Sequence, residues 1–319
     1  MKKIMTYVLL VGLAVALVGC GSSSSSASSN SSSTTTSSTP SIVSVTDSQG
    51  DTVEVDYQPK KVVVFDNSAL DTIDALGAGD SIVGAATSSM PDYLEQYKDI
   101  ESAGGIKEPD LEKINELQPD LIIISGRQAD FKKDLSAIAP TIYLGVDNSK
   151  TWDSIEENIL TIAKIYGKED EAKEQLADLT TSIDEVKAKA EKSGDKALVT
   201  LISEGSISAY GAGSRFAIVH DTFGFAQADD TIEASTHGQN VSYEYILEKN
   251  PDILFVVDRT QAIGGDTSNN DMVDNELVKQ TNAGKNNKVI QLDPQVWYLA
   301  GSGLESLKIM IDDVNQAFD

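Results

Sequence analysis

Cysteine, histidine and arginine are scarce in this chain of 319 residues. Cys20 is the single cysteine, which excludes an internal disulfide. Two histidines without a pair of thiols exclude the usual zinc sites, because a bare transition metal normally requires three or four protein ligands. Arginine occurs only as Arg127, Arg215 and Arg259, and every other basic residue is a lysine.

Catalytic signatures and a basic surface are also missing. The chain contains no G-x-S-x-G elbow, no H-E-x-x-H motif and no identifiable nucleophile–base pair. The glycines in residues 210–215 do not make a P-loop, since the lysine and the spacing are absent. A formal net charge of −25 argues against partners such as nucleic acid or anionic lipid. A cell-surface hydrolase is therefore only a remote alternative.

The first forty residues read as export and anchoring signals. Lys2 and Lys3 precede an apolar stretch from residue 4 to 18 that is short for a membrane span, and no other stretch is long enough. The sequence Leu-Val-Gly-Cys ending at Cys20 resembles the bacterial lipobox, in which the cysteine becomes diacylated. We predict a lipoprotein signal peptide at 1–19, lipidated Cys20, and a disordered Ser/Thr-rich tether across 20–40. The protein is then anchored on the extracellular face of the cell membrane.

Short apolar runs alternate with helical patterns after residue 40. This alternation indicates βαβ units and largely parallel sheets. Gly205 and Ser206 make residues 197–210 resemble a hairpin. We predict strands at 62–66, 82–87, 121–125, 141–146, 197–202, 206–210, 253–258 and 288–292, and helices at 69–76, 109–118, 169–192 and 303–317.

One long helix divides the predicted elements. Its apolar residues follow a 4-3-4-3-4 spacing on one stripe, namely Ala172, Leu176, Leu179, Ile183, Val186 and Ala190. A coiled-coil partner helix is the alternative, although the stripe spans fewer than four heptads. The predicted fold is α/β: two Rossmann-like lobes, at 41–168 and 193–319, joined by the helix at 169–192, with a ligand cleft between them. A helical link is stiffer than loop hinges, so we expect small lobe motions.

An internal repeat gives two of the arginines a common position. Residues 110–127 and 242–259 align without a gap, each as a short helix, a Pro-Asp turn and an apolar strand. Arg127 and Arg259 end the two segments, at the carboxyl ends of strands, where open α/β sheets bind ligands. The identical pairs are Glu112/Glu244, Ile114/Ile246, Glu116/Glu248, Pro119/Pro251, Asp120/Asp252 and Arg127/Arg259.

The remaining candidates are one arginine, one histidine and one tyrosine. Arg215 follows a glycine-containing segment, where it either contacts a ligand or pairs locally with Asp221. His237 lies in a polar loop, whereas His220 lies in an apolar helical pattern and reads as a packed residue. Tyr298 follows the predicted strand 288–292. Its phenolate is a hard donor suited to ferric iron, and packing with the preceding tryptophan is the alternative.

These features together resemble a known family. The signal, tether, lobes and linking helix are similar to substrate-binding proteins of bacterial iron-siderophore and cobalamin ABC importers. The resemblance extends to the catecholate subgroup, and specifically to the petrobactin-type binding lipoproteins of Gram-positive bacteria. It is strongest in KVVVFDNSALDTIDALG (61–77), KEPDLEKINELQPDLIIISGRQ (107–128), APTIYLGVD (139–147), STHGQNVSYEYILEKNPDILFVVDR (235–259) and WYLAGSGLES (297–306).

The resemblance implies a receptor rather than an enzyme. Three arginines of the subgroup hold an anionic ferric catecholate, and they match Arg127, Arg215 and Arg259. Some members add a histidine and a tyrosine that coordinate iron, which match His237 and Tyr298.

The resemblance also implies partners. Glutamates of related proteins dock on a permease, and Glu112 and Glu244 match them. A monomer would then deliver the ferric siderophore to an ABC permease driven by its ATPase, with no intrinsic cofactor. A haem- or cobalamin-binding receptor of the same fold is the alternative, but it favours an apolar, aromatic cleft over three arginines.

Overall fold

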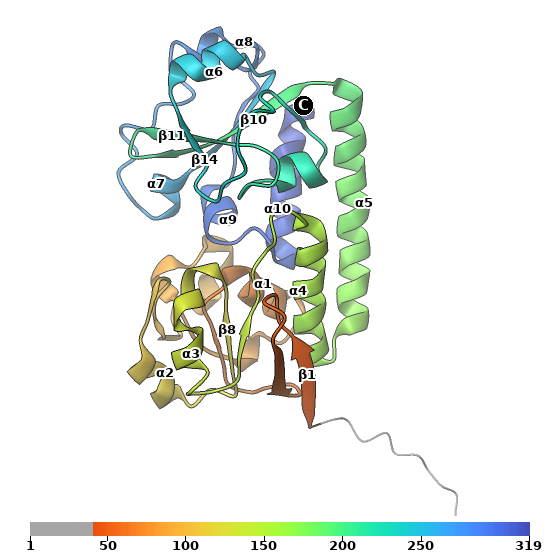
Figure 1. Ribbon diagram of the computed structural model, residues 1–319, viewed down its shortest axis with the longest axis vertical. Helices are drawn as coiled ribbons and strands as arrows, with labels where there is room; N and C mark the ends of the chain where they lie inside the picture. The colour runs from red at the N-terminus through yellow and green to blue at the C-terminus, as the bar shows by residue number, and fades with distance from the viewer. Residues whose placement is uncertain (1–40) are drawn as a thin grey trace, which may run out of the picture. The chain divides into compact units, whose positions relative to one another are not determined.

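The computed structural model describes residues 41–319, which lie within one compact unit. Two α/β lobes build this unit, and the helix α5 (Glu169–Ser193) runs beside both of them (Figure 1). The predicted fold class is therefore confirmed. The residue limits of 168 and 193 for the lobes stay a prediction, and the predicted signal peptide, Cys20 and tether lie outside the described residues.

The N-terminal lobe is built on a parallel five-stranded sheet in the order β5-β4-β3-β8-β9. All four residues of β8 are fully buried, as expected for a strand covered on both faces. The predicted strands end earlier than expected, at residues 64, 85, 124 and 143. The strands are β3 (Val62–Val64), β4 (Ile82–Ala85), β5 (Glu101–Ser102), β8 (Leu121–Ile124) and β9 (Thr141–Tyr143). A separate short antiparallel pair joins β6 (Gly104–Gly105) to β7 (Glu108–Pro109).

Helices connect these strands. The predicted helices at 69–76 and 109–118 are confirmed as α1 (Asn67–Ala75) and α2 (Leu111–Leu117), each capped by an aspartate side chain. The helix α4 (Thr151–Tyr166) was not predicted from the sequence, and it ends at Gly167 in the left-handed conformation. The short helix α3 (Lys132–Leu135) precedes β9.

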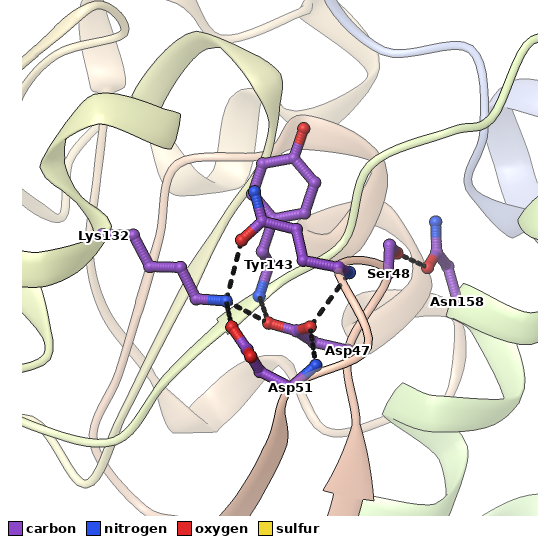
Figure 2. A network of polar contacts seen from close by, with 7 residues as sticks. Asp47, Ser48, Asp51, Lys132, Tyr143 and Asn158 are labelled. Atoms are coloured by element: carbon purple, nitrogen blue, oxygen red, sulfur yellow. Dashed lines mark hydrogen bonds and ion pairs between the residues drawn. The ribbon is translucent and has the colours of Figure 1, made fainter.

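A hairpin absent from the prediction opens the described chain. Its strands β1 (Ile42–Thr46) and β2 (Thr52–Asp56) pair antiparallel. Asp47, at the turn, is buried and accepts hydrogen bonds from Lys132 Nζ at 2.6 Å and from the Tyr143 backbone N–H at 3.2 Å. Lys132 also binds Asp51 at 2.7 Å (Figure 2). Because α3 supplies the lysine and β9 the backbone donor, this network fastens the hairpin to the lobe.

The C-terminal lobe contains a mixed six-stranded sheet in the order β13-β11-β10-β14-β15, with β12 beside β10. The predicted hairpin is confirmed, since β10 and β11 pair antiparallel through a turn at Glu204 and Gly205. The strands are β10 (Lys196–Ser203), β11 (Ser206–Tyr210), β12 (Ala226–Gln227), β13 (Gln239–Val241), β14 (Ile253–Asp258) and β15 (Val289–Gln291). The helices are α6 (Tyr243–Lys249), α7 (Arg259–Ala262), α8 (Asn282–Lys285), α9 (Pro294–Leu299) and α10 (Leu304–Asn315).

The long helix buries the predicted stripe. The buried residues of α5 are those of the 4-3-4-3-4 spacing, from Ala172 to Ala190, and the helix ends at Gly194. This stripe packs against α4 and α10, so it serves as an intramolecular face rather than a coiled-coil seam. Along residues 41–319, no helix is both long and apolar enough to cross a membrane.

The repeat has the same geometry in both lobes. Asp120 accepts a hydrogen bond from the Lys61 N–H at 3.0 Å, and Asp252 accepts one from the Lys196 N–H at 3.1 Å. Each aspartate therefore holds the start of the neighbouring strand, β3 or β10, in line with its own strand. Gln118 and Asn250 end the two short helices in the left-handed conformation. The helix, turn and strand predicted for each copy are confirmed.

Candidate functional site

A cleft of about 610 Å³ is lined by residues of both lobes. Its N-terminal wall comes mainly from the carboxyl ends of β3, β8 and β9, as expected for an open α/β sheet. Its opposite wall comes from residues 215–218, 236–237 and α9. The lining residues with charged or titratable side chains are Asp66, Lys107, Arg127, Tyr143, Arg215, His237 and Tyr298.

Two arginines from different lobes share one acceptor. Arg127 lies in the 3-10 helix η4 (Gly126–Phe131), directly after β8, and donates from Nη2 to the Tyr298 carbonyl oxygen at 2.8 Å. Arg215 lies after the β10–β11 hairpin and donates from Nη2 to the same oxygen at 2.7 Å. Both side chains are half-buried. Burial, reinforced by the positive charge of Arg127, lowers the pKa of Arg215.

The third arginine contacts the hydroxyl end of the same tyrosine. Arg259, the first residue of α7, donates from Nε to Tyr298 Oη and from Nη1 to Ser203 Oγ, both at 2.8 Å. It does not line the cleft itself. The alternative that Arg215 pairs locally with Asp221 is wrong. Asp221 accepts a hydrogen bond from the Gly213 N–H and makes no ion pair with Arg215 in the described chain. The structure thus brings all three arginines to Tyr298.

Tyr298 lies on α9 and faces three cations. The guanidinium carbons of Arg215, Arg259 and Arg127 lie 4.3, 5.4 and 5.6 Å from its ring centroid, within the range of cation–π attraction. Burial alone would raise the pKa of Tyr298, but the hydrogen bond from Arg259 and the charges of the arginines lower it below 10.0. Tyr298 is also partly buried against the core cluster that contains Trp297, whose ring centroid lies 6.3 Å from that of Phe216.

The two histidines differ as expected from the sequence. His237 is exposed on the cleft wall, and its backbone carbonyl accepts a hydrogen bond from Tyr210 Oη at 3.1 Å. His220 is half-buried in the helix Ile218–Thr222, with Nδ1 2.9 Å from the Phe225 carbonyl oxygen. Burial lowers the pKa of His220. Across residues 41–319, no group of three or more His, Cys, Asp and Glu side chains is arranged to hold a metal ion.

The segment that carries Tyr298 is fastened to the N-terminal lobe. Asp71 of α1 is buried and accepts hydrogen bonds from the backbone N–H groups of Glu305 and Ser306, both at 2.8 Å, at the start of α10. Asn67 donates to the Leu299 carbonyl oxygen at 3.2 Å. Burial raises the pKa of Asp71, and the two helix N–H groups counteract this rise. These bonds fix the position of α9 relative to β3 and β8.

Sequence reasoning missed several residues of the cleft. Lys107, in the turn between β6 and β7, is exposed and lines the cleft, but a lysine among many lysines carries no signal. Asp66 and Tyr143 also line it, at the ends of β3 and β9. Their positions at the carboxyl ends of predicted strands were a usable signal, as they were for Arg127, Arg259 and Tyr298.

The two predicted docking glutamates lie outside the cleft. Glu112 and Glu244 are exposed in the first turns of α2 and α6. A hydrogen bond from Ser242 lowers the pKa of Glu244, so that side chain is ionised at neutral pH. Figure 1 shows α2 and α6 at the far ends of the two lobes.

Comparison with known proteins gives consistent matches over most of the chain. The sequence model of the periplasmic binding protein family matches residues 62–296. The petrobactin-binding protein YclQ of Bacillus subtilis is 50% identical over 268 residues, which are 83% of this chain and 84% of that protein. The ferric-anguibactin-binding protein FatB of Vibrio anguillarum is 35% identical over 277 residues, 84% of this chain and 85% of that protein.

Solved structures agree with the sequence matches. The crystal structure of YclQ superimposes with a TM-score of 0.85 at 48% identity, covering 87% of this chain and 99% of that one. The iron-uptake substrate-binding protein PiuA of Streptococcus pneumoniae superimposes with a TM-score of 0.84 at 45% identity, covering 88% and 100%. With its two lobes, linking helix and interlobe cleft, this chain belongs to the periplasmic binding protein family.

Proposed function

We propose that this protein is the receptor of an iron-siderophore ABC importer and binds a ferric catecholate siderophore of the petrobactin type in the interlobe cleft. One observation carries the proposal: the three arginines of a chain that otherwise uses lysine converge on one tyrosine at this cleft. The relatives named for binding petrobactin and ferric anguibactin support a ferric siderophore as the ligand. Its task is then capture and delivery, not catalysis.

The charge of the ligand matches this cluster. A ferric tris-catecholate carries three negative charges, which three guanidinium groups balance. Each guanidinium binds anionic oxygens through a planar fork and stacks on an aromatic ring, which an ammonium cannot do. A charge-assisted hydrogen bond in a partly buried site contributes about 1.5–3 kcal/mol. Arginine at these positions therefore gives affinity that lysine would not.

We further propose that His237 and Tyr298 complete the coordination of iron when the siderophore supplies only four donor atoms. Both side chains line the cleft. The lowered pKa of Tyr298 favours the phenolate, which is the form that binds ferric iron. His237 is exposed and free to turn toward a bound complex.

Delivery requires a membrane partner. We propose that Cys20 carries a lipid anchor, so that a monomeric receptor is held on the extracellular face of the cell membrane beside its permease and ATPase. Relatives at 28% and 29% identity are named as lipoproteins, one of them as an ABC transporter substrate-binding lipoprotein. Glu112 and Glu244, exposed on the two lobes, are the proposed contacts with the permease.

The test is a titration of the purified protein with ferric catecholates, haem and cobalamin, in which quenching of the intrinsic fluorescence reports binding. We expect ferric catecholates to bind, and Arg127→Ala, Arg215→Ala and Arg259→Ala each to weaken binding at least about tenfold. The corresponding lysine variants should recover only part of the loss, because they restore charge without the fork.

Lys60→Ala is the matched control, because Lys60 is exposed and does not line the cleft. The substitution removes one positive charge outside the site and should leave the affinity unchanged. Binding of haem or cobalamin in preference to every ferric catecholate contradicts the proposed ligand. Unchanged affinity in all three alanine variants contradicts the proposed site.

A further inference from the structure

One carboxylate stands in a cleft whose other charged groups are cationic. Asp66 follows β3 and is the acidic residue among those that line the cleft in the described chain. Lys107, Arg127 and Arg215 line the same space. None of these cations lies within 4.0 Å of Asp66, so no ion pair in residues 41–319 neutralises its charge.

The structural role of Asp66 does not require a charge. Its Oδ1 accepts a hydrogen bond from the Ala69 N–H at 2.9 Å and caps the N-terminus of α1. Asparagine caps helices about as well as aspartate does. Within the described chain, Oδ2 has no hydrogen-bond partner, although Asp66 is half-buried. One oxygen is therefore used by the fold, and the other remains available on the cleft wall.

An aromatic ring lies in the same wall. Tyr143, at the end of β9, lines the cleft, and in residues 41–319 its hydrogen bonds come from the backbone alone. Burial, and after it the charge of Asp66, raises the pKa of Tyr143, which agrees with the carboxylate lying close to this ring. A carboxylate and an aromatic ring that line the same cleft wall are a combination that attracts ammonium groups.

A purely anionic ligand would be repelled by this carboxylate. Like charges brought together in a binding site act mainly on specificity, because they penalise the wrong ligand. We propose that Asp66, with the ring of Tyr143, is a subsite for a cationic ammonium group on the ligand. This proposal rests on the proposed function: the anionic chelate faces the arginines, and a cationic arm faces the start of α1.

Two matched ferric complexes test the subsite. The tris complexes of dopamine and of 4-ethylcatechol share the ferric catecholate core, but each dopamine arm carries an ammonium group, so the dopamine complex is about neutral and the 4-ethylcatechol complex is trianionic. Because the arginines respond to this difference in net charge, the measured quantity is the ratio of the two affinities in each variant. We expect Asp66→Asn to weaken binding of the dopamine complex and to strengthen binding of the 4-ethylcatechol complex, so that this ratio shifts about fivefold toward 4-ethylcatechol relative to the wild type, as for the loss of one partly exposed ion pair.

Asp110→Asn is the control variant. Asp110 caps α2 through the same type of hydrogen bond, is exposed, and does not line the cleft. It removes the same charge from a helix N-cap and should leave the ratio of the two affinities at its wild-type value. Because asparagine retains the cap, circular dichroism and the thermal midpoint should match the wild type in both variants.

The outcomes separate the two proposals. If the wild-type protein binds neither complex, the proposed function fails, and the subsite fails with it. If both complexes bind but Asp66→Asn leaves their ratio unchanged, the subsite is wrong while the receptor function stands. An equal gain in affinity for both complexes also overturns the subsite, because it makes Asp66 a general repulsive charge.

Discussion

Tyr298 presents two different groups to the arginines. Its backbone carbonyl accepts from Arg127 and Arg215, and its hydroxyl accepts from Arg259. A substitution at this position removes only the second of these interactions, because the carbonyl is independent of the side chain. The ionised phenolate would be stabilised by the three charges, and its contribution can therefore be isolated by pH.

We expect tyrosinate absorbance, as the difference between wild type and Tyr298→Phe, to titrate with a midpoint below 10.0. Because the pKa of Tyr298 is lower in the folded state than in the unfolded state, ionisation of its hydroxyl stabilises the fold. This stabilisation begins above the folded-state pKa and is complete above the unfolded-state pKa of about 10. The pH-dependent part of the stability difference between the wild type and Tyr298→Phe should thus grow as the pH rises toward 10.0 and disappear toward neutral pH, where only the loss of the hydrogen bond from Arg259 remains.

Denaturant unfolding at several pH values measures this difference. Tyr243→Phe is a suitable comparison, because burial, together with the charge of Asp271, raises the pKa of Tyr243. Its difference titration should have a midpoint above 10.0. A difference midpoint above 10.0 for Tyr298 would show that burial outweighs the arginines.

Site residues could be predicted from the sequence where their residue type is rare in this chain, because a rare type stands out from the background. The scarcity of arginine and histidine pointed to Arg127, Arg215, Arg259 and His237. The shared carbonyl of Tyr298 was not predictable, since every residue carries such a group and only the fold selects one. Lys107 was missed because lysine is common in this chain.

At the scale of elements, the contact between α1 and α10 depends on a glycine. The position of a Cβ on Gly303 lies 2.6 Å from the Ser68 carbonyl oxygen and against the Asp71 carboxylate. Gly303→Ala would therefore force α10 away from its cap on Asp71. We expect a loss of about 1–3 kcal/mol in the free energy of unfolding, measured by denaturant titration.

Gly105→Ala is the control for this prediction. A Cβ there meets no atom closer than 3.9 Å, and its backbone lies outside the left-handed region. Its unfolding free energy should stay close to the wild-type value. If Gly303→Ala proves equally stable, the α1–α10 junction is looser than its hydrogen bonds indicate.

Long periodic patterns and continuous apolar runs identified most elements correctly. The stripe of α5 and the runs of β8 and β14 are examples, because burial alone decides their type. The hairpin of β1 and β2 was missed, since its strands bury few residues and depend on Asp47 and Lys132, which are far apart in sequence. The predicted strands were too long where apolar residues continue past the strand into loops that line the cleft.

At the scale of the whole molecule, the two lobes are joined by more than one connection. The helix α5 runs beside both, and α10 packs on α1 as well as on α5. Several parallel connections resist hinge closure more than a pair of loops does. Binding should therefore proceed with little change in the arrangement of the lobes.

Small-angle X-ray scattering of the protein with and without a ferric catecholate tests this expectation. We expect the radius of gyration to change by no more than the experimental error. A contraction of several ångströms on loading would mean that the α1–α10 junction opens and closes. In that case Gly303→Ala, in which the α1–α10 junction is weakened, should show a larger change in the radius of gyration than the wild type.

The shared acceptor at Tyr298 has a consequence for the energetics of exchange. The guanidinium groups of Arg127 and Arg215 donate hydrogen bonds to the Tyr298 carbonyl oxygen. An anion bound as proposed would replace that oxygen rather than bulk water, so its net affinity would be the difference between two sets of hydrogen bonds. We therefore expect the Tyr298 carbonyl oxygen to act as an internal competitor that lowers the net affinity for an anionic ligand.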